Sequence, residues 1–112
     1  MQCPAGSPSR ATLLTGRTTM QHGVADQVTE ATPAPASFNN ETLLSDLLSV
    51  RGYNCGYAGL WDLSDYRKPG YGFDFTYTVG PGVTYRDPNV SRNGAETSEK
   101  GYVTELITKA GV

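Results

Sequence analysis

Several features of nucleic-acid-binding, membrane and secreted chains are scarce or missing in this sequence. Its 9 basic residues are outnumbered by 11 acidic ones, for a formal charge of −2, so no basic stripe exists to release phosphate counterions. No run approaches the roughly 20 apolar residues that span a bilayer. The start lacks the charged and apolar regions of a signal peptide. We therefore expect no nucleic-acid partner and no membrane span, and the compartment stays unassigned.

Cysteine is limited to Cys3 and Cys55, whose spacing matches no zinc motif. The two could pair as a disulfide, but we favour two free, partly buried thiols. At 112 residues the chain is at most one ordinary domain, which is small for an enzyme that closes a deep site.

The spacing of apolar residues, together with capping and turn residues, predicts an α/β organisation. Ser7 is a good N-cap and Pro8 a good first helical residue, so a helix should begin there and stop at Gly16. After an aperiodic loop, Asn40 is expected to cap a second helix with apolar residues at spacings of three and four, ending at Gly52. The later elements follow in order: strands over 53–58 and 73–77, a tight turn at Asn93-Gly94 and a helix over 100–110.

These elements are too few to complete a fold. A helix, a glycine and a strand in succession are typical of an α/β unit that feeds a parallel sheet. So few strands and three helices cannot cover such a sheet on both faces. We therefore expect other strands to lie outside these residues.

The start of the first helix has an unusual charge. Arg10 stands near the third helical position, where the positive end of the helix dipole disfavours a cation. An anion between them would explain the placement: backbone N–H groups, the Ser7 and Ser9 hydroxyls and the guanidinium would converge on one tetrahedral oxyanion. The alternative is that Arg10 pairs with a nearby carboxylate. The residues alone leave both interpretations open.

The run from Gly6 to Arg17, Gly-Ser-Pro-Ser-Arg-Ala-Thr-Leu-Leu-Thr-Gly-Arg, resembles the signature of the sulfatase family. That signature is Cys or Ser, any residue, Pro, Ser and Arg, then a short helix ending Leu-Thr-Gly-Arg. Further motifs resemble the family in order and spacing: His22-Gly23-Val24, Glu41-Thr42-Leu43-Leu44, Arg51-Gly52-Tyr53, Gly59-Leu60-Trp61-Asp62-Leu63, Gly72-Phe73-Asp74 and Lys100-Gly101-Tyr102-Val103-Thr104. The resemblance therefore covers nearly the whole chain.

The resemblance implies an alkaline-phosphatase-like α/β sandwich, with a mostly parallel sheet flanked by helices, that is incomplete in this chain. Residues 1–112 would be a fragment of one N-terminal catalytic domain. The implied activity is hydrolysis of sulfate esters, carried by small molecules or carbohydrates. Family members are often periplasmic, secreted or lysosomal.

The same resemblance shows where expected catalytic residues are replaced. In the family the Cys or Ser that opens the signature is oxidised to formylglycine, whose hydrated aldehyde attacks sulfur. That position is Gly6, which has no side chain to oxidise; Cys3 is three residues too early, and Ser7 one too late. The family's Lys and His around the Trp correspond to Leu60 and Asp62, which removes positive charge and adds negative charge beside the transition state.

Arg10 is the basic residue of the implied catalytic site that this chain keeps. The calcium ion of the family would be held by residues before the signature and late in the domain, outside this chain, so we assign no metal ligand. The remaining aspartates considered are expected to be solvated or capping: Asp26, Asp46, Asp65 and Asp74. We expect a sulfatase-family protein with weak or no activity. The alternatives are a non-catalytic sulfate-binding or structural module and a truncated gene product.

Two other features have both a functional and a structural interpretation. His22 could be catalytic, but packing or hydrogen bonding behind the first helix is the favoured role. Trp61 with Tyr53, Tyr57, Tyr66 and Tyr71 could line a carbohydrate or aryl pocket, whereas core packing at the strand end is the plainer interpretation.

Overall fold

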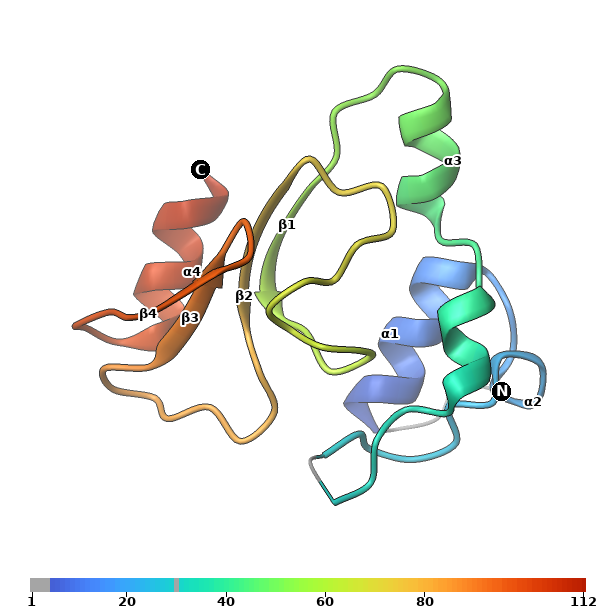
Figure 1. Ribbon diagram of the computed structural model, residues 1–112. Helices are drawn as coiled ribbons and strands as arrows, with labels where there is room; N and C mark the ends of the chain where they lie inside the picture. Colours follow the sequence, from blue (N-terminus) through green and yellow to red (C-terminus); the bar gives the residue numbers. More distant parts are fainter. Residues whose placement is uncertain (1–4, 30) are drawn as a thin grey trace.

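The computed structural model describes residues 5–29 and 31–112, so Cys3 lies outside the described residues. Within these described ranges, the elements follow in this order (Figure 1): α1 (Gly6–Thr15), α2 (Thr19–His22), the 3-10 helix η1 (Ala36–Asn40), α3 (Leu44–Val50), β1 (Gly56–Leu60), β2 (Phe75–Val79), β3 (Asn89–Arg92), β4 (Ala95–Ser98) and α4 (Val103–Gly111). The predicted α/β class is confirmed.

The four strands form one sheet in the order β1-β2-β3-β4. β1 and β2 run parallel, with Gly56 opposite Phe75 and Leu60 opposite Val79, as the α/β unit predicts. β2 and β3, and then β3 and β4, pair antiparallel. The sheet of the described residues is thus mixed rather than mostly parallel. The expected turn is confirmed as the hairpin between β3 and β4, with positive φ at Asn93.

The C-terminal end of α1 lies where the sequence predicts it, whereas the N-terminal ends of α1 and α3 differ from the prediction. Gly16 caps the C-terminus of α1 in the left-handed conformation, at φ 68°, as predicted. At the other end the N-cap is Ala5 rather than Ser7, which lies inside the first turn. Asn40 closes η1 and does not cap α3. That helix begins after Leu43, whose N–H donates to Asp46 Oδ2 at 2.8 Å.

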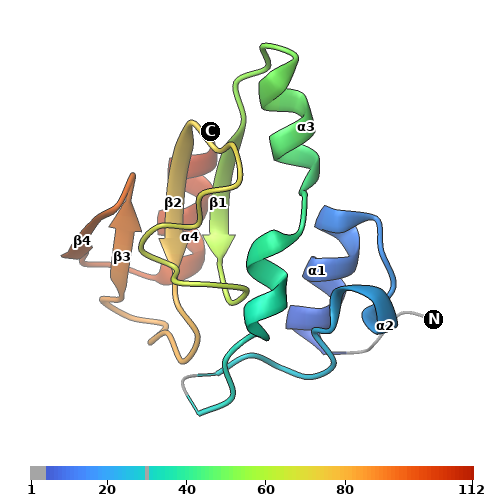
Figure 2. The same ribbon diagram turned by 45° about the vertical axis from the view of Figure 1, so that its right-hand side comes forward.

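Two apolar clusters lie on opposite faces of β1, because successive strand side chains point to opposite sides. On one face Ala58 and Leu60 pack with Tyr77 of β2 and with the apolar residues of α4. On the other, Trp61 and the half-buried Tyr57 pack with residues of α1 and of the loop after it. Figure 2 shows α4 behind the sheet, with α1, α2 and α3 grouped together beside β1.

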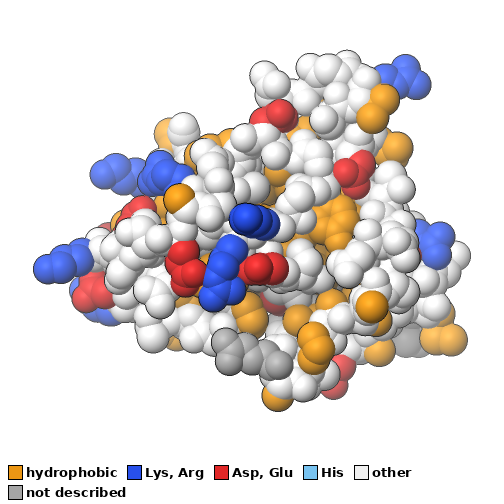
Figure 3. Space-filling view, in the orientation of Figure 1, with side chains coloured by type: hydrophobic (Ala, Val, Ile, Leu, Met, Phe, Trp, Pro, Cys, Tyr) orange, Lys and Arg blue, Asp and Glu red, His pale blue; other side chains and the backbone are white. Residues whose placement is uncertain are grey.

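The surface of the described part carries mixed charge, with acidic and basic side chains side by side near the middle of the face in Figure 3. Within the described ranges, no helix is both long and apolar enough to cross a membrane. The apolar stripe predicted for α3 is largely uncovered, since Leu44, Leu47 and Val50 remain exposed.

Candidate functional site

The candidate site lies where β1 ends and α1 begins. The last contact of β1 with β2 is a hydrogen bond from the Trp61 N–H to the Val79 carbonyl, at 2.9 Å. The chain then turns, and Asp62 projects toward α1, where its side chain is completely buried. Ligands of open α/β sheets bind beyond the carboxyl ends of parallel strands, and Asp62 occupies that position.

One oxygen of Asp62 accepts three hydrogen bonds, two from α1 and one from the loop after α2. Asp62 Oδ2 accepts from Ser7 Oγ at 2.6 Å, from Arg10 Nη1 at 3.0 Å and from Gln27 Nε2 at 2.9 Å. The contact with Arg10 is also an ion pair. The sequence left two interpretations of Arg10 open, an anion ligand or a carboxylate of the protein. The structure supports the second, and the carboxylate that pairs with Arg10 is buried.

Gln27 also closes the first turn of α1. Its Oε1 accepts the backbone N–H groups of Gly6, at 3.0 Å, and Ser7, at 3.3 Å. The Ser7 hydroxyl accepts the Val28 N–H at 2.8 Å. Ser7 does not cap its helix, because its hydroxyl is committed to Asp62 and Val28 while Gln27 takes the free helix amides. Nothing in the sequence singles out Gln27, a polar residue in an aperiodic loop.

The second oxygen of Asp62 has a different environment. Oδ1 is buried and has no hydrogen-bond partner among the described residues. A buried carboxylate oxygen without a donor costs free energy, so the three bonds to Oδ2, of which the one from Arg10 is also an ion pair, must offset that cost.

The fold brings together four of the residues that the resemblance selects: Gly6, Ser7, Arg10 and Asp62. A Cβ at Gly6 would lie 2.9 Å from Arg10 Nη1 and 3.3 Å from Gln27 Oε1, so the glycine leaves the room in which this cluster closes. Ser9 lies in the same first turn of α1, where its N–H donates to the Ala5 carbonyl at 3.3 Å.

Leu60 takes no part in this cluster. It packs against the apolar face of α4, on the opposite side of β1 from Asp62. The resemblance places Leu60 where the family has a sulfate-binding Lys, but here the strand points this side chain into a hydrophobic core.

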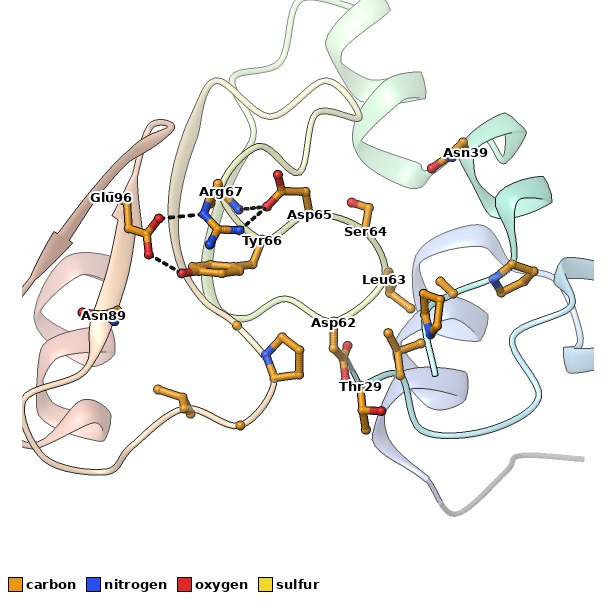
Figure 4. A pocket seen from close by; sticks show the side chains of 18 of the residues that line it. Thr29, Asn39, Asp62, Leu63, Ser64, Asp65, Tyr66, Arg67, Asn89 and Glu96 are labelled. Atoms are coloured by element: carbon orange, nitrogen blue, oxygen red, sulfur yellow. Dashed lines mark hydrogen bonds and ion pairs between the residues drawn. The ribbon is translucent and has the colours of Figure 1, made fainter. Parts of the chain in front are cut away.

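A pocket of about 660 Å³ adjoins the cluster and has Asp62 in its wall (Figure 4). Across the pocket from Asp62, Arg67 pairs with Glu96 at 2.6 Å and with Asp65 at 3.3 Å. The Tyr66 hydroxyl donates to Glu96 at 2.8 Å. The hydrogen bond from Arg67 lowers the pKa of the Glu96 carboxyl, while burial raises the pKa of Tyr66. The guanidinium of this wall is therefore directed at protein carboxylates.

His22 is structural, as favoured. Its ring is buried, its Nδ1 accepts the Val24 N–H at 3.1 Å, and its Nε2 lies 3.0 Å from Thr12 Oγ1 on α1. Since Nδ1 accepts, Nε2 carries the proton and donates to Thr12. Desolvation by burial lowers the pKa of His22, which favours the neutral ring.

The aromatic residues mostly pack in the core. Trp61 is fully buried and meets Tyr57 edge-on, with ring centroids 5.1 Å apart, and it also contacts Tyr71 at 5.9 Å. Tyr53 is exposed, and Tyr66 is the member of the set that lines the pocket. Core packing is thus confirmed for Trp61, Tyr57 and Tyr71.

The described residues do not fit the calcium ion that the family resemblance implies. In residues 5–29 and 31–112, no three His, Cys, Asp or Glu side chains come together as a metal site. The aspartates considered accept backbone N–H groups instead, and one of them also pairs with Arg67: Asp26, Asp46, Asp65 and Asp74. Cys55 is a free, half-buried thiol.

Comparison with known proteins gives one consistent family. A protein-family model described as Sulfatase matches residues 1–111. An N-acetylglucosamine-6-O-sulfatase of Bacteroides thetaiotaomicron is 30% identical in an alignment of 110 residues that covers 94% of this chain and 18% of that protein. Arylsulfatase G of Homo sapiens is 38% identical in an alignment of 78 residues that covers 65% of this chain and 14% of the human protein.

Solved structures agree with the sequence comparison. A protein determined in complex with its substrate D-glucosamine-2-N,6-O-disulfate matches with a TM-score of 0.76 and 29% identity, over 94% of this chain and 20% of that one. A structure at 24% identity, Ps i-CgsB, has a TM-score of 0.74 over 93% of this chain and 29% of its own, which supports the fold. The chain thus spans about a fifth of the first relatives' length. With the family model matched almost end to end, the chain belongs to the sulfatase family.

Proposed function

We propose that residues 1–112 are part of the N-terminal catalytic domain of a sulfatase-family protein that has little or no sulfatase activity. The observation that carries the proposal is the Asp62 carboxylate, which lies 3.0 Å from Arg10 Nη1 and is bonded to Ser7 beside it. The donors expected to hold a sulfate group are thereby engaged by a protein anion.

The nucleophile position supports the same conclusion. Gly6 offers no thiol or hydroxyl from which formylglycine could form. The hydroxyl nearest to it in sequence belongs to Ser7, and that oxygen donates to Asp62 and accepts from Val28. This hydroxyl donates to a buried carboxylate that Arg10 and Gln27 also contact, so it is held inside the cluster by its partners on both sides.

Electrostatics also oppose sulfate binding at this position. An ester sulfate bound by Arg10 would lie near the Asp62 carboxylate, because that carboxylate is 3.0 Å from Arg10 Nη1; a separation of about 5 Å serves for the estimate. At an effective dielectric constant of about 20, two like unit charges at that distance repel by about 3 kcal/mol. Such a penalty is about two powers of ten in binding. The neutral or cationic residue that the family has at this position would carry no such penalty.

The substrate class of the family remains the reference for testing. One relative's solved structure contains D-glucosamine-2-N,6-O-disulfate, and another relative is an N-acetylglucosamine-6-O-sulfatase. We infer that a carbohydrate or small-molecule sulfate ester is the ligand class to which this fold is related.

The alternative of a non-catalytic sulfate-binding module needs the donors at the start of α1 to be open. Here Gln27 accepts the N–H groups of Gly6 and Ser7, and Asp62 engages Arg10. We therefore place the degenerate catalytic domain before the binding module. A truncated gene product is compatible with the same geometry, and the sequence on both sides of these residues would identify it.

The test is hydrolysis by the full-length protein of 4-nitrophenyl sulfate and of N-acetylglucosamine-6-sulfate, with and without calcium. The N-acetylglucosamine-6-O-sulfatase of Bacteroides thetaiotaomicron serves as the positive control. We expect no turnover above that of heat-inactivated protein. Calcium-dependent turnover by the protein with Gly6 intact would overturn the proposal.

A further inference from the structure

We propose that Asp62 and Gln27 form a built-in plug in an oxyanion site at the start of α1, and that removing the Asp62 carboxylate opens this site to sulfate or phosphate. The plug concerns the pocket of the proposed function and rests on it. It makes a separate claim, because it predicts anion binding by a variant rather than turnover by the natural protein.

The first support is the convergence of donors. Ser7 Oγ, Arg10 Nη1 and Gln27 Nε2 come from the helix and from the loop after α2, and all three reach a single oxygen of Asp62 at 2.6 to 3.0 Å. Mixed neutral and charged donors around one oxygen are the arrangement by which proteins hold an oxyanion. In this chain the oxygen they hold belongs to the protein.

The second support is that the other oxygen of the Asp62 carboxylate, Oδ1, has no donor facing it among the described residues. Asp62 is fully buried, yet its Oδ1 has no donor among the described residues. A pocket built for a carboxylate would bond both oxygens, since buried polar atoms are nearly always satisfied. The cluster supplies positive charge and donors for an anion, but Asp62 fills it imperfectly.

Gln27 completes the plug by a separate route. Its amide oxygen covers the first two N–H groups of the ten-residue helix α1, while its amide nitrogen depends on Asp62 as acceptor. Without Asp62 the Gln27 Nε2 loses its partner, so this neutral side chain can turn away and release the helix amides. An incoming oxyanion would then find Arg10, Ser7 and the helix N-terminus available together.

The experiment measures sulfate and phosphate binding by calorimetry on the full-length protein, with sodium chloride at matched ionic strength as the reference. We expect Asp62→Ala to bind sulfate roughly tenfold to hundredfold more tightly than the natural protein, the gain that one charge-assisted contact supplies. Asp62→Asn keeps the side-chain shape and should show a gain in the same direction, which covers the case in which the alanine variant does not fold.

Two controls isolate the plug. Asp65→Ala also removes one carboxylate paired with an arginine, but that carboxylate is 58% exposed and faces Arg67, so sulfate binding should not improve. Adding Arg10→Ala to Asp62→Ala should abolish the gain. If both Asp62 variants fold and bind sulfate no better than the natural protein, the plug is refuted.

Calorimetry and the hydrolysis assay together separate this inference from the proposed function. Turnover of an aryl sulfate by the natural protein would refute the inactive-sulfatase proposal. A gain of sulfate affinity in Asp62→Ala that depends on Arg10 would still establish the plug.

Discussion

Arg10 and Asp62 form one ion pair, yet removing either partner should cost very different amounts of stability. Asp62 has no exposed side-chain surface, whereas the Arg10 side chain is 33% exposed. A guanidinium at that exposure can turn to water when its partner is lost. The Asp62 carboxylate cannot turn to water, because Ser7 and Gln27 enclose it.

The expected magnitudes follow from that asymmetry. Arg10→Ala leaves a buried charge with two neutral donors and one unpartnered oxygen, and breaking a buried pair in this way costs about 3–5 kcal/mol. Asp62→Ala loses three hydrogen bonds but also removes the desolvated charge and its unpartnered oxygen. We expect a net cost of about 1–2 kcal/mol. Arg10→Ala should therefore be the more harmful change by about 2 kcal/mol.

Urea unfolding checks this order. Trp61 is the single tryptophan of these residues, is fully buried and directly precedes Asp62, so its fluorescence reports on the cluster. Free energies should be compared at unchanged m-values. Arg67→Ala is the control: its carboxylate partners are 58% and 37% exposed, so it should cost less than about 1 kcal/mol. Equal costs for Arg10→Ala and Asp62→Ala, or a larger cost for Asp62→Ala, would refute the reasoning.

Three further predictions concern the surroundings of the site. Gly80→Ala should cost about 1–3 kcal/mol in urea unfolding, because the new Cβ would lie 2.6 Å from the Tyr66 ring; an unchanged midpoint would contradict this. Burial lowers the pKa of His22 below 6.5, so stability should fall as pH drops below about 6.5, and His22→Gln should flatten that profile. Burial and the hydrogen bond to Glu99 raise the pKa of Tyr77 to about 12. The folded protein should therefore keep the Tyr77 proton beyond pH 10, and stability should decline between about pH 10 and 12. An ultraviolet titration of the folded protein, with Tyr77→Phe as reference, measures the protonation of this side chain.

The sequence predicts best the turns and helix ends that need a residue with positive φ. Gly16 ends α1 because a left-handed residue without a Cβ penalty closes a helix there, and Asn93 with Gly94 forms the hairpin turn for the same reason. The strands on either side of that turn were not predicted. β3 and β4 have four residues each, and β4 is exposed throughout, so neither carries a clear apolar alternation.

Caps were predicted less well because good capping residues have competing partners. Ser7 has the right chemistry for an N-cap, but Asp62 lies 55 positions away and takes its hydroxyl. Family motifs located Gly6 and Arg10 by their spacing within the signature, and Asp62 by its place beside Trp61 in the later motif Gly59-Leu60-Trp61-Asp62-Leu63. Gln27 could not be found in this way, because its role exists only once the loop after α2 lies against the start of α1.

The replacements at positions 6 and 62 are physically coupled rather than independent. A side chain at position 6 would place its Cβ 2.9 Å from Arg10 Nη1, which is the atom that pairs with Asp62. A cysteine there would require the end of the flexible Arg10 side chain to shift, which strains its ion pair with the buried Asp62 carboxylate. Replacing Asp62 first frees Arg10 to move, and the cysteine then meets only the ends of flexible side chains. The cost of a side chain at position 6 should therefore be smaller in a protein that lacks the Asp62 carboxylate than in one that keeps it.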